Sequence, residues 1–187
     1  MITHERARIA VALAAASMGT VAAALAVSAC SGTPDTSLDT EVAAPDYNQF
    51  IGKGIDPTKQ ASPSFLLEQR CGTLDCHGQV GRALRIYGQD GLRFVTDGGT
   101  APGLGGTTDI EHTANYQSVI GLQPEIMTLV VTGSNPPEAL MLIRKPLQLE
   151  RHKGGAVFVS GDDAYNCLTS WLAGTTDFNA CYNGTTH

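Results

Sequence analysis

Apolar positions are concentrated at the start of the chain. The stretch from Ile9 to Val27 is almost wholly alanine, valine, leucine and isoleucine, and Arg6 and Arg8 precede it. A basic start followed by an apolar run is the pattern of a signal peptide. We therefore expect residues 1–29 to direct export and to be removed.

The end of this apolar run carries a second signal. It reads Leu25, Ala26, Val27, Ser28, Ala29, Cys30. This segment resembles a lipobox, in which a branched aliphatic residue and small residues precede a lipidated cysteine. The resemblance implies cleavage before Cys30 and a lipid anchor on it, and the lack of an acidic residue at Ser31 and Gly32 favours the outer membrane, facing the periplasm. An ordinary signal peptide or a membrane-spanning helix is the alternative, since the run is close to the roughly 20 residues that span a bilayer.

A polar stretch follows the cysteine. Residues 31–60 are rich in Thr, Asp, Pro, Ala and Gly, with few large apolar side chains, which predicts a flexible tether over 30–60. The remainder, 61–187, is long enough for one domain. The formal net charge of −6 argues against nucleic acid as a partner.

Three stretches of this domain carry helix-start signals. Ser62 before Pro63 predicts a helix that ends at Cys71, since the missing proline donor is harmless in a first turn. A capping box at 108–111 opens a helix to about residue 120, and another at 160–163 opens one that ends near Gly174. In the second helix the expected buried positions are Ile110, Ala114, Val119 and Ile120.

The segments between these helices predict irregular structure. Residues 81–107 are rich in glycine and read as loop with short strand. The candidate core contacts there are Leu84, Ile86, Tyr87, Leu92, Phe94 and Val95. Residues 125–131 and 139–143 are short apolar stretches of undecided type, separated by a turn at 133–137. The fold class expected is a mostly α, small helical domain with long glycine-rich loops.

The cysteines carry further information. Besides Cys30 they are Cys71, Cys76, Cys167 and Cys181. An oxidising compartment disfavours free thiols, so two assignments are open: lipid, haem thioethers and one disulfide, or lipid and two disulfides. Cys167 lies on the last predicted helix, and its expected disulfide partner is Cys181.

The sequence from Cys71 to Gly78 has the form Cys-x4-Cys-His-Gly. A c-type haem needs two thiols and a histidine beside the second one, usually with two residues between the cysteines. Here there are four, so two extra residues must bulge while Cys76 and His77 stay adjacent.

Together with four later motifs, this segment resembles the class I-like cytochrome c domains of bacterial periplasmic proteins. The matching residues are Cys71, Cys76, His77 and Gly78; Gly91, Leu92, Arg93 and Phe94; Gly98 and Gly99; His152, Gly154 and Gly155; and Tyr165, Leu168, Trp171, Leu172 and Gly174. The resemblance spans most of residues 64–174. It implies that Phe65, Leu66, Leu168 and Trp171 share one core and that the glycines let the backbone approach the haem edge.

The same resemblance implies the iron ligands. His77 would be the proximal ligand and His152 the distal one, with Met141 as the alternative; a histidine pair lowers the potential relative to methionine. Two other interpretations are open: His152 is a solvated surface residue, or Met141 is a core residue.

His112 lies on a polar stretch and is expected at the surface. A structural zinc site at Cys71, Cys76 and His77 would lack its fourth ligand.

These observations predict an electron carrier that holds one haem c and is anchored to a membrane. It would not itself be an enzyme, and it would exchange electrons with redox partner proteins that the sequence does not identify. The alternative is a haem-free, disulfide-stabilised interaction module on the same lipid anchor. A third hypothesis keeps the haem with an open distal position for peroxide or gas chemistry.

Overall fold

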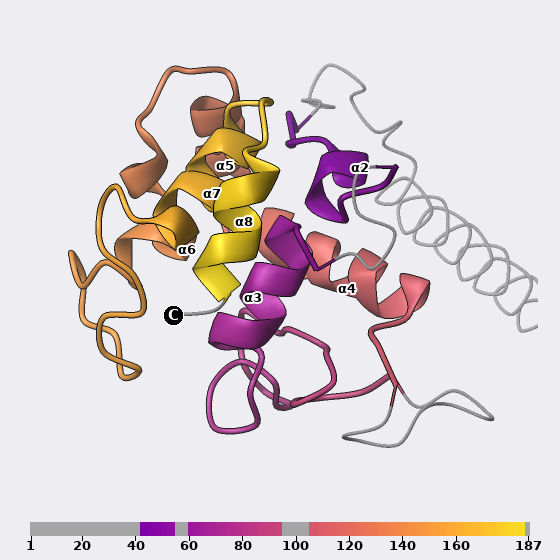
Figure 1. The fold of residues 1–187 in the computed structure, drawn as a ribbon. Helices are drawn as coiled ribbons and strands as arrows, with labels where there is room; N and C mark the ends of the chain where they lie inside the picture. Colours follow the sequence, from indigo (N-terminus) through magenta and orange to yellow (C-terminus); the bar gives the residue numbers. More distant parts are fainter. Residues whose placement is uncertain (1–41, 55–59, 95–104, 186–187) are drawn as a thin grey trace, which may run out of the picture. The chain divides into compact units, whose positions relative to one another are not determined.

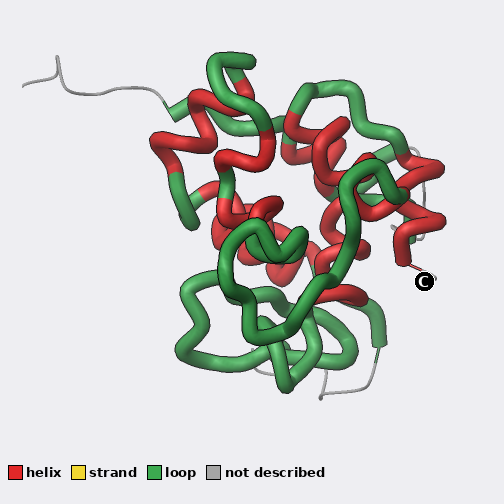
Figure 2. The backbone as a smooth tube through the Cα atoms, turned by 90° about the vertical axis from the view of Figure 1, so that its left-hand side faces the viewer, coloured by secondary structure: helices red, strands yellow, loops and turns green. Residues whose placement is uncertain are grey.

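The computed structural model describes residues 42–54, 60–94 and 105–185. The helices are α2 (Tyr47–Phe50), α3 (Pro63–Cys71), α4 (Asp109–Ile120), α5 (Pro124–Val131), the short 3-10 helix η3 (Pro137–Ala139), α6 (Met141–Arg144), α7 (Asp163–Leu172) and α8 (Phe178–Thr185) (Figure 1). Within those ranges the helices are joined by long loops and no strand is present (Figure 2); Tyr87 and Leu92 form an isolated bridge. The expectation of a mostly α domain is confirmed.

Local capping signals account for the helix starts. The Ser62 hydroxyl accepts a hydrogen bond from the Phe65 amide, and Pro63 is the first residue of α3. The capping box at Thr108 is present with both of its hydrogen bonds, to and from Glu111. These two helices therefore begin where side chains satisfy the otherwise unpaired amides of a first turn, as predicted.

The start of α7 differs from the expected position. Asp162, not Ser160, is the N-cap residue, and its carboxylate accepts from the Tyr165 amide at 2.8 Å. The same carboxylate also accepts from the Val159 amide at 2.8 Å, so it satisfies donors on both sides of the turn. Gly174 follows the helix with φ +79°, a left-handed conformation that favours glycine, as expected for a helix end.

The core lies where α3, α7 and α8 meet. Figure 1 shows α8 beside α7 and across α3. Leu66, Leu168 and Trp171 are buried in one core, as expected, whereas Phe65 is only half-buried. The predicted disulfide between Cys167 and Cys181 is present and joins α7 to α8, so the C-terminal segment is bonded covalently to the core.

The predicted tether is wrong for residues 42–54, which fold against the domain. Phe50 is fully buried, with its ring centroid 5.0 Å from that of Trp171 and 5.5 Å from that of Tyr116. The Trp171 indole donates a hydrogen bond to the Asp46 carbonyl at 3.0 Å. The reason is that a buried indole N–H needs an acceptor and the aromatic side chains need apolar cover, and this segment supplies both. The signal peptide and Cys30 lie outside the described residues.

Helix α4 buries Val119, as expected, leaves Ala114 and Ile120 half-buried, and buries polar side chains in place of Ile110. Ile110 is 57% exposed, whereas Glu111, His112, Asn115 and Val119 are buried. Polar partners make this orientation favourable: Asn115 exchanges hydrogen bonds with the backbone of Tyr87, at 2.6 and 2.8 Å. The surface position expected for His112 is therefore wrong.

The two undecided apolar stretches are helical, forming α5 and, around residues 137–144, η3 and α6. Of the expected loop contacts, Leu84 and Ile86 are buried, Phe94 is 41% exposed, and Val95 lies outside the described residues.

None of the helices in the described ranges has both the length and the apolar character needed to cross a membrane.

Candidate functional site

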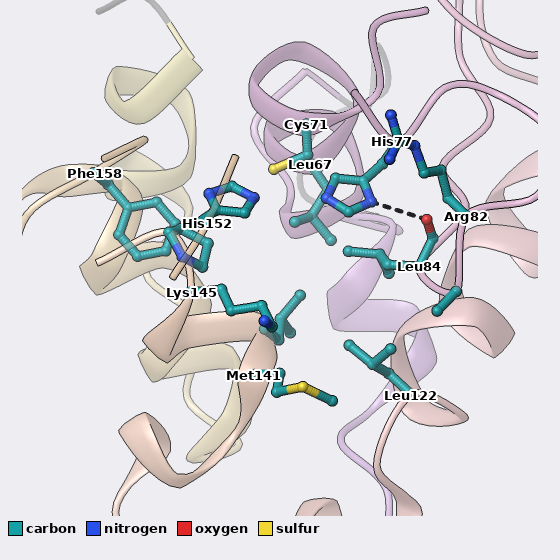
Figure 3. A pocket seen from close by; sticks show the side chains of 13 residues that line it. Leu67, Cys71, His77, Arg82, Leu84, Leu122, Met141, Lys145, His152 and Phe158 are labelled. Carbon is teal, nitrogen blue, oxygen red and sulfur yellow. Dashed lines mark hydrogen bonds between the residues drawn. The ribbon is translucent and has the colours of Figure 1, made fainter. Parts of the chain in front are cut away.

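Two hollows meet at His77 and His152. The first is a largely apolar cavity of about 700 Å³, including the space at its mouth. Its lining is Leu67, Cys71, His77, Arg82, Ala83, Leu84, Leu122, Met141, Leu142, Lys145, Pro146, His152 and Phe158 (Figure 3). The second is a more polar cleft of about 1150 Å³, which shares the two histidines and Cys71 and adds Cys76.

The imidazole rings of His77 and His152 face each other. Their centroids are 6.2 Å apart and their planes are inclined by only 13°. Figure 3 shows the two rings pointing toward one another across the cavity, from opposite walls. The residues are 75 positions apart in sequence, so only the fold brings them together.

Each ring is oriented by a carbonyl. His77 Nδ1 lies 2.9 Å from the Leu84 carbonyl oxygen, and His152 Nδ1 lies 3.0 Å from the Gly155 carbonyl oxygen. A carbonyl only accepts, so Nδ1 carries the proton in each ring, and in the neutral form Nε2 keeps its lone pair. This is the arrangement in which protein histidines ligate metals.

Burial lowers the pKa of His77. The hydrogen bond to the Leu84 carbonyl opposes that effect, while the nearby His152 and Arg82 add to the lowering. The net result favours the neutral imidazole near pH 7, the form that can bind a metal.

Close backbone contacts hold the loop that carries His77. The His77 amide donates to the Cys71 carbonyl at 2.9 Å, and the amides of Cys76 and Gly78 donate to the Thr73 carbonyl. A Cβ at Gly78 or at Gly91 would lie only 1.9 Å from the Gly72 carbonyl oxygen. These glycines therefore allow close contact between backbone segments.

A glycine pair orients His152. A Cβ at Gly154 would lie 3.1 Å from His152 Cε1, and Gly155 has φ +75°. The Gly155 carbonyl also accepts a hydrogen bond from the imidazole. The His-x-Gly-Gly sequence therefore fixes the orientation of the His152 ring through residues that follow it directly in the chain. The surface role considered for His152 does not apply, because its side chain is half-buried and lines both hollows.

Cys71 and Cys76 are free thiols in the structure. The Cys71 sulfur lies at the apolar cavity (Figure 3). Cys76 is less buried and lines the polar cleft. Burial raises the pKa of Cys71 to about 12, with a contribution from Cys76 against the opposing effect of Arg70. Cys71 is thus a protonated thiol at neutral pH.

Met141, the alternative ligand, lines the apolar cavity, but Figure 3 shows its sulfur well away from the two facing rings. Gly98 and Gly99 of the sequence resemblance lie outside the described residues. In the described ranges, no three His, Cys, Asp or Glu side chains are grouped closely enough to hold a bare metal ion.

The structure adds site residues that sequence reasoning missed. Positive side chains at the polar cleft are Arg70, Arg82, Lys145, Arg151 and Lys153, against one acidic residue, Asp75. They are spread over three segments of a chain with net negative charge, so composition gave no sign of a basic site. Arg151 and Lys153, on either side of His152, were the only local sign of a basic site in the sequence.

Comparison with protein-family models, with curated proteins and with solved structures finds no significant match.

Proposed function

We propose that this domain binds one c-type haem and carries electrons, with Cys71 and Cys76 as thioether donors and His77 and His152 on opposite sides of the iron. The observation that carries the proposal is the facing histidine pair, whose rings are 6.2 Å apart with each Nδ1 on a backbone carbonyl. The resemblance to class I-like cytochrome c domains adds to it from the sequence.

The separation of the rings fits a shared metal ion. A metal–imidazole bond is about 2.0 Å long and a ring centroid lies about 1.1 Å behind its nitrogen, so two opposed ligands have centroids about 6.2 Å apart. Direct hydrogen bonding between the two Nε2 atoms would need a proton on one of them and a shorter approach. The observed centroid separation of 6.2 Å equals the value for two opposed ligands, which supports a pair of ligands to one metal ion.

The lining also fits an amphipathic ring with two carboxylate groups. Leucines and Phe158 line the apolar cavity. Positive side chains of the polar cleft offer charge complementary to the propionates, although Lys145 among them is paired with Glu150 at 2.6 Å. The extra residues of the cysteine motif form a turn closed by the Thr73 carbonyl, with Leu74 59% exposed. This turn keeps Cys76 and His77 adjacent to the cavity despite the widened spacing.

Haem would supply one-electron chemistry at iron. His77 and His152 would hold the iron, and because each ring is already oriented by a backbone carbonyl, little rearrangement would accompany a change of charge. The apolar side chains would exclude water, and with both histidines bound no ligand position would remain for a substrate. An electron carrier follows, rather than an enzyme, and a histidine pair favours a low potential.

Replacement of the distal ligand tests the proposal. Protein made in a host able to attach haem should show a Soret band and a covalent haem mass. His152→Met should retain the haem but raise its potential, on the order of 0.1 V, because a thioether ligand favours reduced iron. Met141→Leu, in the same cavity, is the matched control and should leave the potential unchanged.

The absence of a Soret band and of any haem mass in that host would refute the proposal. Intact mass before and after reduction then decides the alternative: two disulfides indicate the haem-free interaction module. A fall in potential in Met141→Leu, with His152→Met unchanged, would instead assign Met141 as the ligand. Carbon monoxide binding by the reduced wild type would indicate an open distal position.

We also propose that lipid on Cys30 anchors the chain in the outer membrane, facing the periplasm. The support is the lipobox-like segment before Cys30, since more than one lipid chain on one cysteine holds a protein stably. Cys30→Ser should lose incorporation of a labelled fatty acid, and its intact mass should still include residues 1–29, because cleavage follows lipidation of the cysteine. If the wild type incorporates no fatty acid and also keeps residues 1–29, an uncleaved helix is the anchor instead.

A further inference from the structure

Helix α3 separates two different environments. Leu67 and Cys71 line the apolar cavity, whereas Phe65, Glu68 and Gln69 line a separate polar chamber. The full lining of this polar chamber is Gln60, Phe65, Glu68, Gln69, Gln89, Gly106, Thr107 and His112. Its volume is about 520 Å³, and Gln60, Gln89 and Gly106 are exposed, so it reaches solvent.

A buried carboxyl group lies at the inner end of the polar chamber. Glu68 is 5% exposed. Its Oε1 accepts from the Ser64 hydroxyl at 3.0 Å and lies 3.4 Å from His112 Nδ1, and its Oε2 accepts from the Thr107 hydroxyl at 2.5 Å. Ser64 Oγ is also 2.8 Å from His112 Nδ1. The proposed haem site uses none of these groups.

In the part of the chain that the structure describes, the Glu68 carboxylate has polar contacts with Ser64, Thr107 and His112, and none of these three is a lysine or an arginine. Arg93 forms a buried ion pair with Glu111, at 2.8 and 3.0 Å, so its charge is largely neutralised. From α4, His112 and Glu111 face this region, and Arg70 of α3 donates to the Val157 carbonyl instead. Burial raises the pKa of Glu68 to about 7, although the hydrogen bonds from Thr107 and Ser64 oppose the increase.

Glu68 is also close in the chain to the proposed haem attachment. Cys71 is three positions further along α3, and residues at this spacing are neighbours on a helix surface. Two charges roughly 12 Å apart in a protein interior interact strongly enough to move a pKa by about one unit. A charge change at the apolar cavity should therefore be felt at Glu68.

We propose that Glu68 is a proton-binding site coupled to the electron, and that the polar chamber connects it to solvent. The inference rests on the haem proposed above and concerns how that site works. If the bound haem took one electron from a donor protein, the Glu68 carboxylate would bind protons from water more tightly, and with a shift of about one pKa unit it would take up at most about half a proton per electron near neutral pH. When the electron left to an acceptor, Glu68 would release the same fraction, so electron transfer and proton binding would be coupled.

The experiment measures the reduction potential of the haem-loaded protein against pH. Since the reduced protein holds the proton more tightly, the wild-type potential should fall with rising pH around neutrality and level off on either side. Glu68→Gln, which keeps the shape but cannot ionise, should remove this fall. Glu125→Gln, an exposed glutamate on α5, is the matched control and should behave as the wild type.

A second variant tests the direction of the effect. Thr107→Val removes a hydrogen bond that favours the carboxylate, so the pH range in which the potential falls should move upward. Redox-difference infrared spectra should also show a carboxylic acid C=O band that appears on reduction and is missing in Glu68→Gln.

A wild-type potential independent of pH near neutrality would overturn the inference, as would the same fall in Glu68→Gln as in the wild type. In both cases the Soret band and the haem mass persist, so the haem proposal would stand. Loss of haem from the wild-type protein, by contrast, is the failure of the proposed function.

Discussion

Replacing Gly78 with alanine is expected to destabilise the domain by about 3 kcal/mol or more. An ideal Cβ at this position would lie 1.9 Å from the Gly72 carbonyl oxygen and 2.8 Å from the Thr73 carbonyl oxygen. Both obstacles are backbone atoms, which cannot rotate away as a side chain would. The loop that carries Cys76 and His77 would have to move, so haem attachment should fall as well.

Gly106→Ala is the matched control for that change. Gly106 is exposed, has no atom within 4 Å of an ideal Cβ, and keeps its carbonyl for the hydrogen bond from Arg93. Its effect on the free energy of unfolding should stay within about 0.5 kcal/mol. Denaturant unfolding of both variants gives the comparison, and a Gly78→Ala protein as stable as Gly106→Ala would contradict the loop geometry described here.

Glu111→Gln is expected to destabilise the domain by about 3 to 5 kcal/mol at neutral pH. Both side chains of the Arg93–Glu111 pair are 1% exposed. The Glu111 carboxylate also accepts from the amides of Phe94 and Thr108, at 2.8 and 2.9 Å. Removing its charge takes the Glu111 counter-charge away from the buried Arg93 guanidinium and weakens the anchoring of the segments on both sides of residues 95–104.

The pH dependence of this effect follows from the pKa of Glu111. Burial alone would raise that pKa, but the hydrogen bonds from Arg93 and from the Thr108 and Phe94 amides outweigh burial and lower it to about 2. A carboxyl with a lowered folded-state pKa stabilises the fold above its ordinary pKa near 4.5, and this stabilisation is lost as pH falls toward 2. The difference between wild type and Glu111→Gln should therefore narrow in acid.

Urea unfolding at several pH values measures that difference, with the exposed Glu125→Gln as the control. If the difference in the free energy of unfolding between wild type and Glu111→Gln stays constant from pH 7 down to pH 2, the charge of Glu111 is not what stabilises the fold.

Sequence reasoning located the helices from their capping residues, because a Ser62 or Thr108 side chain acts on amides two or three positions away. It failed where a partner comes from far along the chain. His112 was expected at the surface because its neighbours are polar, yet Ser64 and Glu68 provide buried partners from another helix. Residues 42–54 were assigned to the tether because their composition is polar, although Phe50 packs against Trp171.

For the candidate site, the sequence indicated Cys71, Cys76 and His77 from one local motif. It also named His152, but without a physical reason to prefer that residue to Met141. The carbonyls that orient the two rings, from Leu84 and Gly155, are backbone atoms. Backbone acceptors leave no trace in residue identity, so no pattern could have predicted them.

The sequence by itself determined the local features of this protein: two helix starts, the glycine-ended helix α7 and the Cys167–Cys181 pair. Each depends on contacts between residues close in the chain. Only the tertiary structure decided that His77 and His152 face each other, that Glu68 is buried beside His112, and that Gly78 contacts the backbone of Gly72. These depend on how separate segments pack, and packing is a property of the whole core rather than of any one segment.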